Sequence, residues 1–260
     1  MIKKKETAIS NPAKYMSWSK ELFSDKDCVL AAVREDGYAL KYASDDLRAD
    51  REIVLAAVKQ SGKALRNASD DLRADREIVL AAVRQNGRAL GAACTTLRAN
   101  PDVVLAAVQQ NGRALEYASD ELRADREVVL TAVREKGSAL YYASNDLRAD
   151  KEVALAAVQQ GGYALQFASE DQRADKEVVL VAVQNDGTCL RYASNELRND
   201  KDVVLAAVKN NGYALRFANK RLRADCKIAC VAIRNKPDAV EWVSKTLLVE
   251  AMLNAFGQTK

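Results

Sequence analysis

A period of 25 residues limits what this chain can fold into, because it runs without interruption through most of the sequence. Glycine recurs at positions 37, 62, 87, 112, 137, 162, 187 and 212, with Pro237 in the ninth place. Aspartate recurs at positions 25, 50, 75, 125, 150, 175, 200 and 225, with Asn100 in the remaining place. The spacing predicts nine tandem repeats over residues 25–249, numbered 1 to 9 below. A repeat this short cannot bury its apolar residues alone, so neighbouring repeats must stack.

Each repeat has the pattern of two short helices, as residues 50–74 illustrate. Asp50 is suited to an N-cap, and Glu52 in the following turn meets the positive end of the helix dipole. The six apolar residues from 53 to 58 predict a first helix that is covered on several sides. Gly62 is predicted to cap that helix at its C-terminal end in a positive-φ conformation. A second helix is expected over 63–68, followed by a turn that Ser69 caps.

These features predict an all-α fold, an α-solenoid of nine 25-residue helix-pair repeats with degenerate capping ends. A leucine-rich repeat of similar length would need an alternating strand segment and an asparagine or cysteine ladder, which the alanine-rich VVLAAV segments do not provide. Residues 1–24 are expected to form an N-terminal arm with a degenerate half repeat, and residues 250–260 a C-terminal capping helix. Because altered ends oppose end-to-end stacking, we expect a complete array and a monomer.

The recurring motif ALxYASxxLRADxEVVLAAVxxNG resembles the tandem helical family known as domain of unknown function forty-one-sixteen, and it spans about 225 of the 260 residues. The resemblance implies a helical-repeat fold. It implies no activity, cofactor or partner, so the function has to be inferred from the residues themselves.

Catalytic chemistry has little support in this sequence. It contains no histidine, the commonest general base and metal ligand, and neither GxxxxGK[ST] nor GxGxxG occurs. Five cysteines at unrelated positions form neither a disulfide framework nor a paired metal-ligand pattern, which favours a reducing compartment. The N-terminus lacks an apolar signal region, and no stretch approaches the roughly 18 apolar residues of a membrane span. We therefore predict a soluble, cytoplasmic protein that is not an enzyme, contacts no membrane and holds no cofactor or metal.

Eight arginines recur two residues before the capping position, and they could form either an anion-binding stripe or structural ion pairs. They are Arg48, Arg73, Arg98, Arg123, Arg148, Arg173, Arg198 and Arg223. All of them except Arg223 lie four residues before an acid such as Glu52 or Asp102. Pairing within or between repeats is therefore the favoured interpretation, with little stability expected from each exposed pair.

The segment NGRALGAACTTLRAN, residues 86–100, departs from its counterparts by losing bulk and negative charge. Around it, cations and small residues occupy variable positions of repeats 2 to 4: Lys59, Lys63, Arg66, Arg84, Arg88, Gly91, Ala92 and Arg113. Small side chains flanked by cations predict a shallow depression that binds an anionic partner through charge-assisted hydrogen bonds. An acidic or phosphorylated peptide is the favoured partner, and RNA is less favoured. The alternative interpretation is drift on a solvated face of a duplicated repeat.

An aromatic residue recurs in the middle of the second helix, as Tyr42, Tyr117, Tyr142, Phe167, Tyr192, Phe217 and Trp242. Packing between repeats is the favoured explanation, although such a ladder can also stack nucleic-acid bases or anchor a protein interface. The repeats carry net charges of −2, +1, +2, −2, 0, −2, −1, +4 and +1, so no continuous basic track accompanies the aromatics. General nucleic-acid binding is therefore disfavoured. A local site stays open in repeats 2 and 3 and in repeat 8, where Lys209, Arg216, Lys220 and Arg221 cluster.

Variable residues fall mainly at the ends of the first helix and on one face of the second. The sequence favours a non-catalytic scaffold whose variable face contacts another protein or a peptide, as helical solenoids commonly do. The alternative is a structural or spacer element with no specific ligand. Because the variable positions are mostly polar, the sequence does not separate the two.

Overall fold

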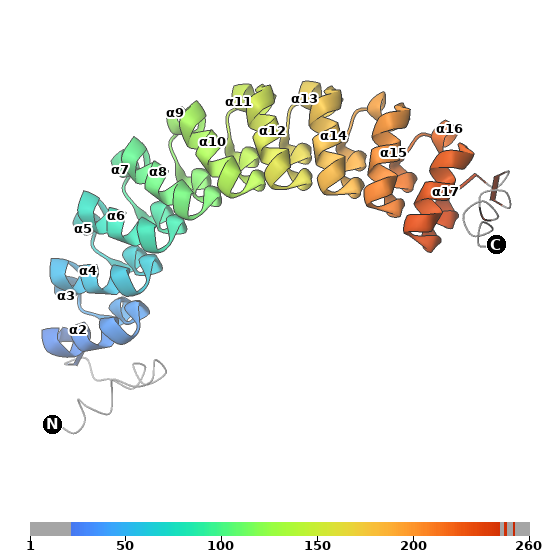
Figure 1. Cartoon of the computed structure of the whole chain (residues 1–260). Coiled ribbons are helices and arrows are strands. Elements are labelled where there is room, and N and C mark those ends of the chain that lie inside the picture. Colours follow the sequence, from blue (N-terminus) through green and yellow to red (C-terminus); the bar gives the residue numbers. More distant parts are fainter. Residues whose placement is uncertain (1–21, 245–246, 249–251, 253–260) are drawn as a thin grey trace. The chain divides into compact units, whose positions relative to one another are not determined.

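The structure is a computed structural model that describes residues 22–244, 247–248 and 252. Within these residues the chain forms helices and no strand, which confirms the predicted all-α repeat fold. It divides into an N-terminal unit, residues 1–135, and a C-terminal unit, residues 136–260. In each unit, repeats of the same form lie side by side (Figure 1). Below, position 1 of a repeat is its capping residue, such as Asp50.

Every repeat begins with a ten-residue α-helix, called helix A here. The A helices are α2 (Lys26–Glu35), α4 (Arg51–Gln60), α6 (Arg76–Gln85), α8 (Pro101–Gln110), α10 (Arg126–Glu135), α12 (Lys151–Gln160), α14 (Lys176–Asn185), α15 (Lys201–Asn210) and α17 (Cys226–Asn235). Each starts at position 2 and ends at position 11 of its repeat.

A 3-10 helix follows at positions 13 to 18 of each repeat. These helices are η3 (Gly37–Tyr42), η4 (Gly62–Asn67), η5 (Gly87–Ala92), η6 (Gly112–Tyr117), η7 (Gly137–Tyr142), η8 (Gly162–Phe167), η9 (Gly187–Tyr192), η11 (Gly212–Phe217) and η12 (Pro237–Trp242). A third, shorter element completes repeats 1 to 8: α3 (Asp45–Arg48), α5 (Asp70–Arg73), α7 (Thr95–Arg98), α9 (Asp120–Arg123), α11 (Asn145–Ala149), α13 (Glu170–Ala174), η10 (Leu197–Asn199) and α16 (Lys220–Arg223).

Side-chain caps start the helices where the sequence predicts them. Asp50 Oδ1 accepts hydrogen bonds from the backbone N–H groups of Glu52 and Ile53, at 2.9 and 3.2 Å. Ser69 Oγ accepts one from Leu72 N at 3.4 Å. Each such cap contributes about 1 kcal/mol to helix stability. Asn100 caps α8 in the same way, and Pro101 occupies the first helical position, where its missing N–H has no helical partner to lose.

Helix A supplies most of the core. In α4, Ile53, Val54, Ala57 and Val58 are fully buried, because the helix packs against α2 and α6 and against η3 and η4. Burying each of the larger side chains contributes about 1.5–3 kcal/mol. The predicted cover on several sides is therefore present, yet residues 55 and 56 remain half-exposed and one side of the helix meets solvent.

The second element is a 3-10 helix, not the α-helix expected over 63–68. Three residues per turn align every third side chain on one face. Accordingly Gly62, Leu65 and Ala68 are buried together with Ala64, whereas Lys63 and Arg66 are exposed. The six residues of η4 exceed the three or four that are usual for a 3-10 helix. Packing on two A helices therefore overrides α-helix propensity here.

The recurrent glycine serves a close approach between repeats, so its predicted role as a positive-φ cap is wrong. No glycine among the described residues has positive φ. The chain leaves α4 through an extended Ser61, with φ −144° and ψ 108°, and Gly62 opens η4. A Cβ on Gly62 would lie 2.3 Å from the carbonyl oxygen of Ala82 in the next A helix. Any larger residue would push the two repeats apart.

An amide side chain at position 11 links the same two elements. Gln85 Oε1 accepts a hydrogen bond from Gly62 N at 2.6 Å, and Gln85 Nε2 donates to Gln60 O at 3.4 Å. The glycine contact recurs from glycines 37, 87, 137, 187 and 212 to Gln60, Gln110, Gln160, Asn210 and Asn235. We call this contact the amide clip. It satisfies an N–H group that the packing takes away from water.

Ion pairs join the starts of neighbouring A helices. Lys151 Nζ, at position 2, lies 2.8 Å from Asp175 Oδ2, the N-cap of the next repeat, and 2.8 Å from Glu177 Oε2. The same arrangement starts from Lys26, Arg51, Lys176 and Lys201. The hydrogen bond from Lys151 holds the pKa of Asp175 below its usual value. In these five pairs of repeats the N-cap carboxylate is thus tied electrostatically to the repeat before it.

The expected terminal segments lie mostly outside the described residues. Within the expected half repeat, residues 22–24 form a short 3-10 helix, η2 (Leu22–Ser24). The expected capping helix over 250–260 falls outside them except for Met252. None of the helices in the described part of the chain has the length and hydropathy needed to cross a membrane.

Candidate functional site

The 3-10 helices present the variable residues of the repeats as one face. Positions 14 and 17 are exposed or half-exposed and are aligned by the three-residue turn, and position 18 lies beside them. Five large apolar side chains of the described residues are exposed. Four of them lie at these positions, namely Tyr38, Tyr42, Tyr141 and Tyr163, exposed by 42, 37, 58 and 48 %, and the fifth is Met252 near the C-terminus. We call positions 14, 17 and 18 the 3-10 face. It is the natural candidate for contact with a partner.

In the N-terminal unit the 3-10 face is basic. Its twelve side chains include one acid, Glu116, and five cations: Lys41, Lys63, Arg66, Arg88 and Arg113. The predicted patch lies on adjoining segments, because η4 contacts η5 and η5 contacts η6. Its residues on these segments are Lys63, Arg66, Arg88 and Arg113. Lys59 and Arg84 lie apart from the face, at position 10 on the exposed side of α4 and α6.

A depression was predicted at Gly91 and Ala92, and at Gly91 this prediction is wrong. A Cβ on Gly91 would lie 2.9 Å from the ring of Tyr117, so that ring occupies the room the glycine leaves. Arg88 Nη2 donates a hydrogen bond to Tyr117 Oη at 3.1 Å and lies 3.8 Å from Glu116 Oε2. Ala92 is half-buried beside them. The lost bulk of repeat 3 therefore accommodates the tyrosine of repeat 4.

Three cations of the predicted patch keep their charge available to a partner. Lys63, Arg66 and Arg113 are exposed, and their side chains form no ion pair with any carboxylate of the described residues. Arg88 differs because it is already paired with Glu116. The structure thus divides the predicted patch into cations that contact the protein and cations that face solvent.

In the C-terminal unit the same face is aromatic. Eight of its fifteen side chains are aromatic, namely Tyr141, Tyr142, Tyr163, Phe167, Tyr192, Tyr213, Phe217 and Trp242. Position 18 of one repeat packs edge-on against position 14 or 17 of the preceding repeat: the ring centroids are 5.3 Å apart for Tyr141 and Phe167 and 5.4 Å apart for Tyr163 and Tyr192. The ladder at position 18 therefore joins repeats, while the rings at positions 14 and 17 remain exposed.

Two arginines lie over these rings. The Arg191 guanidinium carbon is 4.5 Å from the ring centroid of Tyr192 and 5.5 Å from that of Tyr163. Arg216 lies 4.4 Å from the centroid of Phe217. Sequence analysis named the position-18 aromatics but missed Tyr141, Tyr163 and Arg191. A three-residue period in the second helix would have placed all of them on one face.

The arginine ladder has a structural role, with different partners from those expected. Arg73 Nη2 pairs with Asp70, three residues before it, and Arg48 and Arg123 pair equivalently with Asp45 and Asp120. The acids four residues later are bound elsewhere, since Glu52 pairs with Lys26 and Asp102 with Arg76. Arg148 Nε also donates to the carbonyl oxygen of Phe167 in the next repeat, at 2.6 Å.

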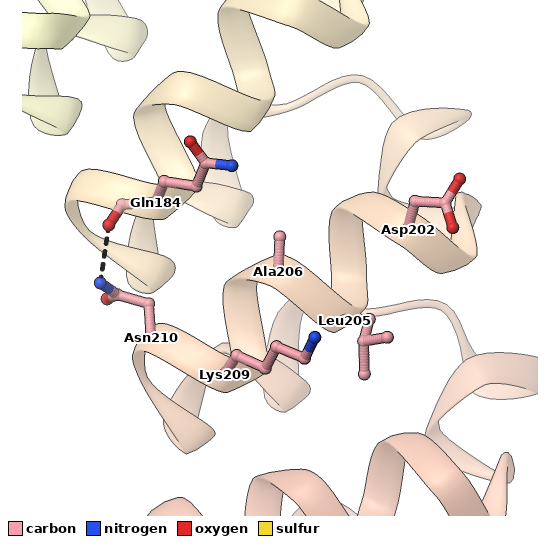
Figure 2. A pocket seen from close by; sticks show the side chains of 6 residues that line it. All are labelled: Gln184, Asp202, Leu205, Ala206, Lys209 and Asn210. Carbon is pink, nitrogen blue, oxygen red and sulfur yellow. Dashed lines mark hydrogen bonds between the residues drawn. The ribbon is translucent and has the colours of Figure 1, made fainter.

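A second kind of surface lies on the solvent side of the A helices. In the C-terminal unit a depression of about 520 Å³ is lined by Gln184, Asp202, Leu205, Ala206, Lys209 and Asn210, whose side chains are drawn in Figure 2. The equivalent positions of repeats 3 and 4 line another of about 460 Å³. Beside the first, Asn210 Nδ2 donates to Gln184 O at 2.8 Å. Asn210 Oδ1 accepts the amide-clip hydrogen bond from Gly187 N, so part of the lining belongs to the amide clip. Because the same framework positions line both depressions, we assign them to repeat packing.

Metal and thiol chemistry have no evident site in the described residues. No group of three or more Cys, Asp or Glu side chains there could hold a metal ion. Cys28, Cys189 and Cys230 are buried, and burial raises the pKa of Cys189 to about 12. Cys94 occupies the serine cap position but accepts no capping hydrogen bond. Cys226 Sγ and Cys230 Sγ lie 3.8 Å apart, one turn along α17.

The comparisons with known proteins concern the whole repeat array. The model of the family described as "Domain of unknown function (DUF4116)" matches residues 6–48, 50–98, 75–123, 100–148, 125–173, 175–223 and 204–248. The chain belongs to this family. The overlapping matches follow the 25-residue period described above. In comparisons with curated proteins and with solved structures, nothing matches significantly.

Proposed function

We propose that this DUF4116 protein is a non-catalytic scaffold that binds other proteins through its 3-10 face. The observation that carries the proposal is the distribution of exposed tyrosines: Tyr38, Tyr42, Tyr141 and Tyr163 all lie on that face. Tyrosine is enriched at the energetic centres of protein interfaces. A spacer without a ligand would have no need to expose such side chains.

The framework and the face have separate tasks in this proposal. Buried valine, alanine and leucine positions, the glycines and the amide clip hold the repeats together. Positions 14 and 17 lie outside the buried core and differ from repeat to repeat. This division is typical of helical repeat arrays, which keep a stacking core and vary their binding surface.

An anionic partner, acidic or phosphorylated, is the class we propose for the N-terminal unit. Lys63, Arg66 and Arg113 there are exposed and form no ion pair within the described residues, and they can form charge-assisted hydrogen bonds with carboxylates or phosphates. Arg88 supports the site by orienting Tyr117, to which it donates a hydrogen bond.

Quantitative affinity capture from source-cell lysate tests the proposal. The full chain is compared with a variant carrying Lys63→Ser, Arg113→Ser and Tyr163→Ser, since Ser138 occupies the equivalent position in repeat 5. A control variant carries Arg84→Gln and Gln184→Lys on the A helices, exchanges that repeats 4 and 8 already contain. Circular dichroism first establishes that all three are equally helical.

We expect one or more proteins to be captured by the native chain and by the control, and to be lost from the 3-10 variant. Equal capture by all three would place binding elsewhere. No enrichment by the native chain would favour the spacer alternative.

A further inference from the structure

We propose that the 3-10 face of the C-terminal unit binds an extended acidic peptide segment that also carries an aromatic or large apolar residue. Arg191 and Arg216 would bind its carboxylates, and Tyr141 and Tyr163 its apolar side chain. The proposal rests on the scaffold function above and specifies the ligand at this part of the face.

The four residues lie on one run of adjoining segments. They belong to η7, η8, η9 and η11, and each of these contacts the next. Tyr141 and Tyr163 both pack against Phe167, with centroids 5.3 and 6.4 Å apart. Tyr163 in turn lies under Arg191. The exposed rings and the first cation therefore form a continuous surface.

Both guanidinium groups are positioned for an anion. Each guanidinium carbon lies within 4.5 Å of a ring centroid, that of Tyr192 or Phe217. A cation–π contact of this kind does not use up the five N–H donors of an arginine, which can still bind a carboxylate. Neither arginine forms an ion pair with a carboxylate of the described residues. In contrast, Arg48, Arg73 and Arg123 of the arginine ladder are each paired with an acid of their own repeat.

The spacing of the two arginines suits an extended chain. They occupy position 17 of consecutive repeats, and packed helices lie about 8–10 Å apart. An extended peptide advances about 3.3 Å per residue. Carboxylates three residues apart would therefore reach both guanidinium groups, and a residue five or six places further along would reach Tyr141, two repeats away.

The tyrosines provide the apolar part of the surface. Tyr141 and Tyr163 are 58 and 48 % exposed, yet both are held in edge contacts with neighbouring rings. A ring already fixed by packing loses little conformational freedom when a ligand covers it. Burial raises the pKa of Tyr192 to about 12, and its ring lies beneath Arg191.

Nucleic acid fits this part of the face less well than an acidic peptide. Of the fifteen side chains, two are cations, Arg191 and Arg216, and two are acids, Asp238 and Glu241. A phosphate backbone needs a continuous line of cations to release its counterions. Two isolated guanidinium groups among rings suit a few carboxylates of a peptide.

Selection from a library of random twelve-residue peptides displayed on phage, with the full chain immobilised, tests the inference. The affinities of the enriched peptides are then measured by fluorescence anisotropy. Arg191→Gln with Arg216→Gln removes the charges, and Tyr141→Gln with Tyr163→Ser removes the rings; Gln166 and Ser138 are their counterparts in other repeats. Gln159→Lys with Gln184→Lys alters the A helices as a control.

We expect enriched peptides with two acidic residues three places apart and an aromatic residue further along. The arginine variant should weaken them about tenfold or more, as loss of charge-assisted hydrogen bonds does, and the control should leave affinity unchanged. Peptides without acidic residues, or unaffected by the arginine variant, would overturn the inference, as would the absence of enrichment. If the peptides that overturn the inference still lose affinity in the Tyr141 and Tyr163 variant, the scaffold function stands. If no substitution on the 3-10 face changes their affinity, both the inference and the scaffold function are contradicted. A twenty-nucleotide oligo(dT) that binds more tightly than the peptides and loses affinity with the arginines would assign the surface to nucleic acid instead.

Discussion

Gly62 and Ala82, twenty residues apart, meet through backbone alone: a Cβ on the glycine would lie 2.3 Å from the alanine carbonyl oxygen. The glycines at 37, 87, 137, 162, 187 and 212 make the same approach to the next A helix, at 2.2–2.4 Å. This contact sets how closely repeats stack, and the buried side chains around it are sized accordingly.

Gly62→Ala should therefore lower the free energy of unfolding. The added methyl group meets backbone, which cannot move without shifting α6, and overpacking of this kind costs about 1–3 kcal/mol. Urea denaturation followed by circular dichroism measures the loss. Gly161→Ala is the matched control, since nothing lies within 4 Å of its Cβ position. Equal effects from the two substitutions would contradict the close-approach explanation.

Gln110→Leu should destabilise the protein, whereas Gln109→Leu should not. Gln110 Oε1 accepts the hydrogen bond of Gly87 N at 2.5 Å, and an N–H group left without an acceptor in a packed interface costs about 1–3 kcal/mol. Gln109 is its exposed neighbour on α8 and forms no side-chain hydrogen bond within the described residues. Parallel urea titrations compare them. The amide clip is unimportant if both variants unfold at the native midpoint.

Asp175→Asn should cost stability near neutral pH and progressively less in acid. The hydrogen bond from Lys151 lowers the pKa of Asp175 from its usual value of 3.8. A carboxylate with a lowered folded-state pKa contributes stability above its unfolded pKa, and the contribution is lost as the pH falls through the folded pKa. Asparagine preserves the cap, as Asn100 does. Free energies of unfolding of both proteins at pH 7 and pH 3 provide the comparison; a difference that persists at pH 3 would assign the effect to capping geometry.

Gly91→Gln and Tyr117→Ala should be strongly coupled. The glutamine side chain needs the space that the Tyr117 ring occupies, so the substitution should destabilise the native chain and be tolerated once the ring is removed. Contacting residues commonly show interaction energies of about 0.5–3 kcal/mol in a double-mutant cycle. Four denaturation curves give the value. Additive effects would mean that the ring turns aside at no cost.

The repeat boundaries, the helix caps and the buried apolar residues could all be predicted, because each depends on local sequence. Asp50 and Ser69 are capping residues wherever they occur, and a run such as Ile53 to Val58 needs cover in any fold. The role of Gly62 was misassigned because a glycine is required there by the close contact with Ala82 in the next repeat. Local conformational propensity does not contain that contact. The 3-10 conformation of the second helix was missed for the same reason, since packing on two A helices selects it.

The candidate face was predicted in part. The cations and position-18 aromatics could be named from variation among the repeats, and Lys63, Arg66 and Arg113 are indeed exposed. Tyr141, Tyr163 and Arg191 were overlooked because only the aromatic at position 18 recurs from repeat to repeat, although positions 14 and 17 share a face in an α-helix as in a 3-10 helix. Arg88 was predicted as a cation of the patch, but it contacts Glu116 and Tyr117. This could not be predicted from local sequence because both partners belong to the next repeat.

The amide clip also gives the array a direction. The N–H groups of glycines 37, 62, 87, 137, 187 and 212 each donate to a side chain of the following repeat, so these repeats are completed by their successors. In repeat 9 the glycine position holds Pro237, which has no N–H to offer and a ring where the other repeats have only hydrogen. A further A helix could not approach Pro237 as closely as α6 approaches Gly62. Proline therefore opposes close stacking of a further helix at the same position where glycine permits it in the earlier repeats.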